Sequence, residues 1–273
     1  MLKLYVGRDK VIEPPKGGFC WIGDEIPDVG RARVFDIDTD CVNPLQAIHA
    51  TRDPKEAYRK ARQFAGIFYA ASPEGSDTLT LRNGRRTLAR LFLKSKMDRL
   101  DKVQGYLWKK YEADELTPAE GEALGAVEDV LLSPVLKRIL CNPTNFSLNP
   151  RSKILVRLNR TELSDFDARF LGLLFMAEFS GQLVLPNLGF YVRDFHIMLI
   201  EQKRLIAGVN SLKELEHKAP ELREAVMLMD EKIPCRTTGK DAMELADDRG
   251  LVKGTNAYEE YVKECVNGRT VER

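Results

Sequence analysis

Residues 153–185 read KILVRLNRTELSDFDARFLGLLFMAEFSGQLVL, and this stretch decides the fold class. It begins with a short aliphatic run at 153–158 and ends with a second one at 182–185. Between them, residues 162–179 carry apolar side chains at helical spacing. A strand, a helix and a second strand in this order are typical of a mostly parallel sheet flanked by helices.

The same alternation extends through most of the chain. We expect further strands at 19–22, 33–36, 205–209 and 232–236. We expect further helices at 54–71, 211–229, 240–249 and 258–266. Two of these begin on recognisable helix starts, Asp53 followed by Pro54 and Ser211 followed by Glu214.

Composition is that of an ordinary globular protein. The chain has 273 residues, 44% hydrophobic and 30% charged, and its 42 basic side chains nearly balance 41 acidic ones. With a net charge of +1, affinity for nucleic acid must come from a local patch. The first residues are polar and no apolar run approaches about 18 residues, so we expect no signal peptide, no membrane contact and a cytoplasmic protein. The five scattered cysteines show no CxxC pattern, which favours reduced thiols and no metal site.

Residues 81–140 interrupt the alternation with a wholly helical stretch whose charges are segregated. Residues 82–110 carry ten basic and two acidic side chains, whereas residues 111–129 carry seven acidic and no basic ones. One interpretation is a helical hairpin whose faces neutralise each other across residues 114–118. The other is a basic helix that binds DNA phosphates. The side chains that would do so are Arg85, Arg86, Arg90, Lys94 and Lys96.

Two aspartates near the N-terminus suggest a different activity. The segment VFDIDT at 34–39 is an apolar strand that ends in Asp36 and Asp38. It resembles the nucleophile motif of haloacid-dehalogenase-type phosphohydrolases, which use two aspartates and Mg²⁺. Residues 23–28 resemble the metal motif of that family, but they precede the aspartates instead of following far downstream. Carboxylates just after a strand also form turns and cap helices.

Other motifs of catalysis are missing or ambiguous. The phosphate-binding pattern G-x-x-x-x-G-K-[ST] does not occur, and the nearest glycine turn, at 16–18, precedes a strand. Asp194 and His196 stand just beyond the strand at 182–185, either as a ligand site at the sheet edge or as a hydrogen-bonded structural pair. No serine or cysteine stands in a nucleophile motif.

Several segments together carry a family resemblance. They are 153–172, LVLPNL at 183–188, IEQKRLIAGVNS at 200–211 and IPCRTTGKDAMELA at 233–246. In this order they resemble the strands and helices of conjugative coupling ATPases and of the wider FtsK/HerA class of DNA-pumping motors. The resemblance runs from about residue 31 to about residue 250. It implies a RecA-like, P-loop-NTPase-like α/β core at 1–80 and 141–273, with a helical insertion, a hairpin, at 81–140.

The departures from that family bear on activity. Its paired Walker B acids hold Mg²⁺ and orient water, but Asn187 and Leu188 stand at those positions, and Ser211 stands at the sensor position. The resemblance with these changes implies a non-hydrolysing relative without a bound cofactor, acting as an assembly or scaffold subunit in DNA transfer or viral DNA packaging. One alternative is an active ATPase that binds ATP and Mg²⁺ at an atypical or partner-completed phosphate site. Another is a Mg²⁺-dependent phosphohydrolase that uses Asp36 and Asp38.

Under the catalytic alternatives the site would lie at the carboxyl edge of the sheet. We expect polar side chains from distant parts of the chain to meet there: Asp36, Asn159, Asn187, Asp194 and Asn210. The candidate catalytic residues are Asp36, Asn187, Asp194 and Arg204. DNA, and a partner protein or a second copy of the chain, are the expected partners.

Overall fold

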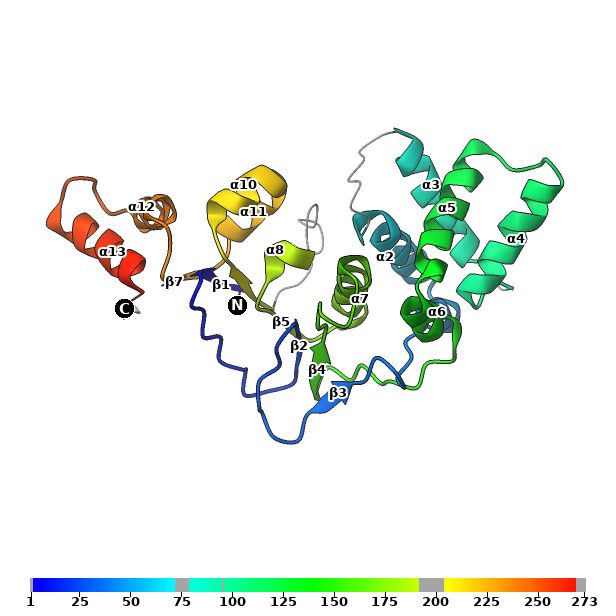
Figure 1. The fold of residues 1–273 in the computed structure, drawn as a ribbon, viewed down its shortest axis with the longest axis horizontal. Coiled ribbons are helices and arrows are strands. Elements are labelled where there is room, and N and C mark those ends of the chain that lie inside the picture. Colours follow the sequence, from blue (N-terminus) through cyan, green and yellow to red (C-terminus); the bar gives the residue numbers. More distant parts are fainter. Residues whose placement is uncertain (1, 72–78, 95, 192–203, 269–273) are drawn as a thin grey trace. The chain divides into compact units, whose positions relative to one another are not determined.

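The computed structural model describes residues 2–71, 79–94, 96–191 and 204–268, and its central feature is a seven-stranded sheet (Figure 1). The strands are β1 (Leu2–Gly7), β2 (Phe19–Gly23), β3 (Arg33–Phe35), β4 (Lys153–Arg157), β5 (Gln182–Leu185), β6 (Leu205–Val209) and β7 (Glu231–Cys235). Their order in the sheet is β3-β4-β2-β5-β6-β1-β7, and all run parallel. The predicted parallel α/β class is therefore confirmed.

β1 is the strand that the sequence pattern does not predict. It lies between β6 and β7 and pairs in parallel with both, so that Leu4 is opposite Ala207 on one side and Lys232 on the other. Leu4 and Val6 are fully buried, whereas the alternate residues Lys3 and Tyr5 are only half-buried. The strand is thus an alternating one, which a search for continuous apolar runs passes over.

The chain divides into two compact units, and the first comprises residues 1–33, 149–156 and 179–273. Its helices are α8 (Leu188–Tyr191), α10 (Leu212–Lys218), α11 (Pro220–Met227), α12 (Gly239–Asp248) and α13 (Asn256–Asn267). The single helix expected at 211–229 is wrong, because Pro220 forces the preceding Ala219 to an extended φ of −159° and starts a new helix. In Figure 1, α12 and α13 lie together beside β7.

The second unit comprises residues 34–148 and 157–178. Its helices are α1 (Pro44–Ala50), α2 (Pro54–Ala71), α3 (Leu79–Phe92), α4 (Leu100–Glu112), α5 (Pro118–Leu132), α6 (Pro134–Cys141) and α7 (Asp165–Glu178). Rings from α2, α3 and α7 form its core, where Phe68 lies 5.2 Å from Phe64, 5.7 Å from Phe92 and 5.2 Å from Phe170 between centroids.

The helical stretch breaks where the sequence predicts. α4 and α5 form an antiparallel hairpin with its turn inside 113–117, and Thr117 starts α5 with a capping box to Glu120. α3 and α6 flank this hairpin in the sequence, so residues 79–141 form more than the expected hairpin. An insertion bounded at 81 and 140 stays a prediction. Among the described residues, no helix is long and apolar enough to cross a bilayer.

Candidate functional site

Four parallel strands of the first unit end at one edge of the sheet. β5 pairs with β6, β6 with β1, and β1 with β7, so the loops after these strands lie next to one another. Each of these loops carries polar side chains, among them Lys10 after β1, Asn187 after β5, Asn210 after β6 and Arg236 after β7. We call these four residues the strand-end site.

Lys10 is held by oxygen atoms of its own chain. Its Nζ donates to Oδ1 of Asn210 at 2.6 Å and to the carbonyl oxygen of Gly7 at 2.8 Å. Its Cε lies 2.9 Å from the position that a Cβ on Gly208 would occupy, so the aliphatic stem lies on the backbone of β6. Burial lowers the pKa of Lys10, while the nearby Cys235 and Glu214 oppose that shift. Two oxygen atoms of the protein itself thus bind the ammonium group.

The end of β1 differs from a phosphate-binding loop. Gly7 has a φ of +130°, and a Cβ there would lie 1.5 Å from the carbonyl oxygen of Cys235, so only glycine fits this close approach to β7. Beyond it, residues 8–18 reach β2 without forming a helix. Phosphate loops use the free N–H groups of a helix start to hold phosphate oxygens. No such helix start follows β1.

Residues 186–191, the described residues that follow β5, include no carboxylate. Asn187 accepts a backbone hydrogen bond from Phe190 N at 3.2 Å, in the turn that starts α8. Leu188 is fully buried at the first position of that short helix. An amide and an aliphatic side chain therefore occupy the positions that the family resemblance equates with the Walker B acids.

The end of β7 brings further charges to this edge. Arg236 has a left-handed φ of +45°, and its Nη1 lies 3.1 Å from Oδ2 of Asp9. α12 then starts on Thr238, whose hydroxyl accepts from the backbone N–H of Asp241. Asp241 is 1% exposed; its Oδ1 accepts from Lys213 N at 3.3 Å and its Oδ2 has no hydrogen-bond partner. A buried carboxylate at this helix start suits the helix dipole and repels an incoming phosphate.

Asp36 and Asp38 form a turn in the second unit. Asp36 Oδ1 accepts from Asp38 N at 2.8 Å, and Asp36 N donates to Oδ2 of Asp40 at 2.9 Å. Hydrogen bonds from Asp38 and Thr39 lower the pKa of Asp36. Arg138 of α6 holds the turn by donating to the carbonyl oxygen of Asp40 at 3.0 Å. These contacts are those of a loop-forming carboxylate, and no three His, Cys, Asp or Glu side chains of the described ranges are grouped to hold a metal ion.

The other predicted site residues are distributed over both units. Asn187 and Asn210 end adjacent strands of the first unit, whereas Asp36 and Asn159 belong to the second. Asp194 and His196 lie outside the described residues. Arg204 is exposed just before β6, where its carbonyl oxygen accepts from Leu183 N at 3.0 Å.

Sequence reasoning missed Lys10 altogether. The available signal was the alternation of Leu2, Leu4 and Val6 before Gly7, which is typical of a strand that ends in a turn. A lysine three residues beyond such a strand is a natural candidate for the sheet edge.

α3 and the residues just after it carry an exposed basic surface, which we call the basic face: Arg85, Arg86, Arg90, Lys94 and Lys96. All five residues are exposed, and within the part of the chain that is described no acidic side chain pairs with Arg85, Arg86 or Arg90. Lys94 Nζ instead donates to the hydroxyl of Tyr106 at 3.1 Å.

The acidic stretch of the hairpin has partners of its own. Glu120 binds Lys110 at 2.6 Å, and Glu128 accepts from Nε1 of Trp108 at 2.9 Å. These contacts join α4 to α5 within the hairpin. The Lys110–Glu120 pair joins the basic stretch to the acidic one across the turn, as the neutralising interpretation expects. Among the described residues no hairpin acid pairs with the three arginines of the basic face.

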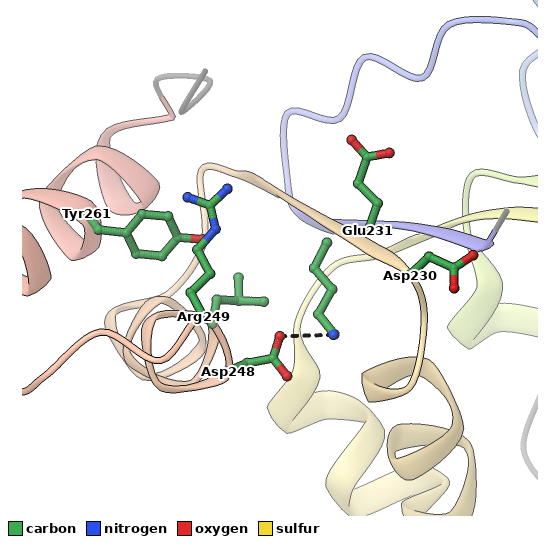
Figure 2. A pocket seen from close by; sticks show the side chains of 7 residues that line it. Asp230, Glu231, Asp248, Arg249 and Tyr261 are labelled. Atoms are coloured by element: carbon green, nitrogen blue, oxygen red, sulfur yellow. Dashed lines mark ion pairs between the residues drawn. The ribbon is translucent and has the colours of Figure 1, made fainter. Parts of the chain in front are cut away.

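A pocket of about 220 Å³ lies at the amino end of β7, where it is also lined by the end of α12 and by Tyr261 of α13 (Figure 2). Lys232 pairs with Asp248 at 2.9 Å, and the guanidinium of Arg249 lies 4.8 Å from the ring centroid of Tyr261. Asp230 accepts from the backbone N–H of Leu2 at 2.7 Å. Glu231 pairs with Lys3 at 2.8 Å, so the charged groups that line this pocket have partners within the protein. The strand-end site lies at the opposite end of β7.

No protein-family model and no curated protein sequence matches the chain. Solved structures do match. The unbound monoclinic form of the bacterial conjugative coupling protein TrwBdeltaN70 is similar over 90% of this chain and 71% of that one, with a TM-score of 0.58 and 11% identity. VirB4 of Thermoanaerobacter pseudethanolicus is similar over 98% of this chain and 84% of that one, with a TM-score of 0.63 and 12% identity. The chain has the P-loop ATPase fold.

The P-loop ATPase fold confirms the predicted resemblance at the level of architecture. At 11–12% identity, what is shared is the fold. Within this P-loop ATPase fold, a lysine bound to an asparagine follows β1, and an asparagine and a buried leucine follow β5.

Proposed function

We propose that the chain is a non-hydrolysing relative of the DNA-translocating ATPases, acting as an assembly or scaffold subunit in DNA transfer or viral DNA packaging. The observation that carries this proposal is the strand-end site, where Lys10 is bound to Asn210 and no helix follows β1. Phosphoryl transfer from ATP needs a phosphate cradle, a carboxylate for Mg²⁺ and a group that orients water. The strand ends of this chain offer Asn187 and Leu188 in place of the carboxylates.

The proposed role includes DNA binding through the basic face. Three of its arginines have no acidic partner among the described residues, so their charge is available to phosphates. Basic side chains neutralised by a neighbouring helix would instead be paired, as Lys110 is with Glu120. The likeness to a conjugative coupling protein supports DNA as the polyanion.

The test is the salt dependence of DNA binding. Replacing Arg85, Arg86 and Arg90 with Ala should weaken duplex binding and flatten the log–log salt slope by about 0.9 for each phosphate that is no longer neutralised. A control that replaces Arg52, Lys109 and Lys137 removes the same charge from other positions of the second unit and should keep the slope. Equal affinity of both triple variants, or wild-type affinity of the first, contradicts DNA binding by this surface.

A scaffold subunit needs a partner. One candidate partner is a hydrolysing motor protein in the cytoplasm, which would supply the energy. The other is further copies of this chain, which would form the assembly. Sedimentation velocity at micromolar concentration separates the two cases, because a monomer points to a different protein and a defined oligomer points to self-assembly.

Lys10 also favours a second candidate function, that of an active ATPase with an atypical phosphate site. It is a partly buried lysine at the carboxyl edge of the sheet, where P-loop enzymes place a phosphate-binding lysine. In that case release from Asn210 would free its ammonium for phosphate. ATP turnover that disappears in Lys10→Ala would establish this alternative, and the absence of turnover in the wild type would exclude it.

A further inference from the structure

A second basic feature lies on α2, next to the basic face. Tyr58, Arg62 and Gly66 are spaced four residues apart and lie along one stripe of that helix. The guanidinium of Arg85, from α3, lies on this stripe, because its Cζ and Nε are each 3.7 Å from the position of a Cβ on Gly66. Arg62 and the guanidinium of Arg85 thus lie on the same stripe of α2.

The two arginines carry like charges, and the described residues give neither of them an acidic partner. Partial burial of its guanidinium lowers the pKa of Arg85, and the like charge of Arg62 on the facing stripe of α2 lowers it further. Within the described ranges, neither arginine forms an ion pair with an acidic side chain. The nearest acid on this helix, Glu56, is bound by Arg59 at 2.7 Å. An anion placed between Arg62 and Arg85 would relieve the repulsion.

An exposed aromatic ring borders the arginine pair. The guanidinium carbon of Arg62 lies 5.9 Å from the ring centroid of Tyr58, and Tyr58 is 44% exposed. A planar ring one helical turn from a phosphate-binding group is suited to stack a nucleobase, which lies about one nucleotide from its phosphate.

We propose that Arg62 and Arg85 bind a phosphodiester group of a nucleic acid strand and that Tyr58 stacks the unpaired base beside it. The inference rests on the proposed DNA binding and deepens it by naming the ligand. A guanidinium group can bind two phosphate oxygens at once, so arginines are well suited to hold a phosphodiester. A base in a duplex is already stacked and paired, so this site favours strands with unpaired bases.

Fluorescence anisotropy with a labelled oligothymidylate of about 15 nucleotides, a site size typical of single-strand binding, tests the proposal. Tyr58→Ala should weaken this binding about fivefold or more, whereas Tyr58→Phe should keep it. An abasic strand of the same length should bind Tyr58→Ala as well as it binds the wild type. Arg62→Ala should weaken both strands and flatten the log–log salt slope by about 0.7. Tyr111→Ala, at an aromatic that is 58% exposed on α4, is the matched control and should bind as wild type.

The outcomes separate this site from the proposed function. If Tyr58→Ala and Arg62→Ala bind as wild type while the triple variant of Arg85, Arg86 and Arg90 loses binding, the site is refuted and DNA binding stands. If Tyr58→Ala weakens a duplex as much as the single strand, base stacking is refuted. If the wild-type chain binds none of the oligonucleotides, both proposals are overturned.

Discussion

Lys10 and Asn210 are 200 positions apart in the sequence, and their side chains meet with 2.6 Å between Nζ and Oδ1. The contact joins the ends of β1 and β6, and a second hydrogen bond fixes the same ammonium to the carbonyl oxygen of Gly7. In the proposed function this internal contact stands where a P-loop ATPase presents its lysine to a nucleotide.

Replacing Lys10 tests whether that contact is structural. Lys10→Met keeps the aliphatic stem over Gly208 and removes both hydrogen bonds, so we expect the free energy of unfolding to fall by about 1 kcal/mol. Urea unfolding followed by circular dichroism gives the value. Arg8→Met removes an exposed cation nearby and should cost much less; equal losses in the two variants would contradict a structural role for the contact.

The β5 end gives a second prediction. Leu188→Glu combined with Asn187→Asp restores a Walker B-like acid pair in sequence, but Leu188 is fully buried. We expect the double variant to lose about 1 to 3 kcal/mol of stability, because it buries a carboxylate without a partner. Asn187→Asp alone, at a half-buried position, should change stability little. A double variant that stays as stable as wild type and binds Mg²⁺ in calorimetry would show that the metal site is absent only because of these two residues.

The strands that the sequence predicts best are the continuous apolar ones. The pattern places β5 and β6 to the residue, because every side chain of β6 and most of β5 are buried and aliphatic. β1 escapes that pattern because its alternate residues are partly exposed, and its place between β6 and β7 depends on a strand order that no local pattern contains.

The same limit explains how much of the site is predictable. Asn187 and Asn210 are identified because they follow recognisable strands in the segments that resemble the motor family. Lys10 follows the strand that the pattern misses, and its partner lies far away in sequence. Asp36 is recognisable as either a nucleophile or a turn residue, and only the hydrogen bonds to Asp38 and Asp40 distinguish these.

Glu178, at the end of α7, gives a pH-dependent prediction. Burial raises its pKa to about 7, against the opposing charges of Lys60 and Arg59. Between about pH 4.5 and 7 the folded chain keeps a proton that the unfolded chain releases, so the free energy of unfolding should fall as the pH rises through this interval and stay level above it.

Glu178→Gln should remove most of that dependence. At about pH 8 we expect the variant to be about 1 to 3 kcal/mol more stable than wild type, with a much smaller difference near pH 4.5. Denaturant unfolding at a series of pH values measures both. Glu112→Gln, at an exposed position of the same unit, is the control. A wild-type chain whose stability rises from pH 5 to 7 would contradict the assignment.

The hairpin offers a prediction that separates stability from DNA binding. Glu120 accepts from Lys110 at 2.6 Å and also closes the capping box with Thr117, so Glu120→Ala should destabilise the second unit by about 1 to 2 kcal/mol. DNA affinity at a temperature where the variant is folded should not change. If the hairpin acids neutralised the basic face, Glu120→Ala would instead bind DNA more tightly than the wild type. The control Glu115→Ala, at an exposed acid of the same stretch, would then show the same gain in DNA affinity.

The most direct test of the central claim is an isothermal calorimetric titration of the purified chain with ATP and Mg²⁺. Because Lys10 is bound to Asn210, no helix follows β1 and residues 186–191 after β5 include no carboxylate, we expect no saturable heat of binding. A dissociation constant below roughly 10 μM, equivalent to about −7 kcal/mol, would contradict a chain without a working nucleotide site.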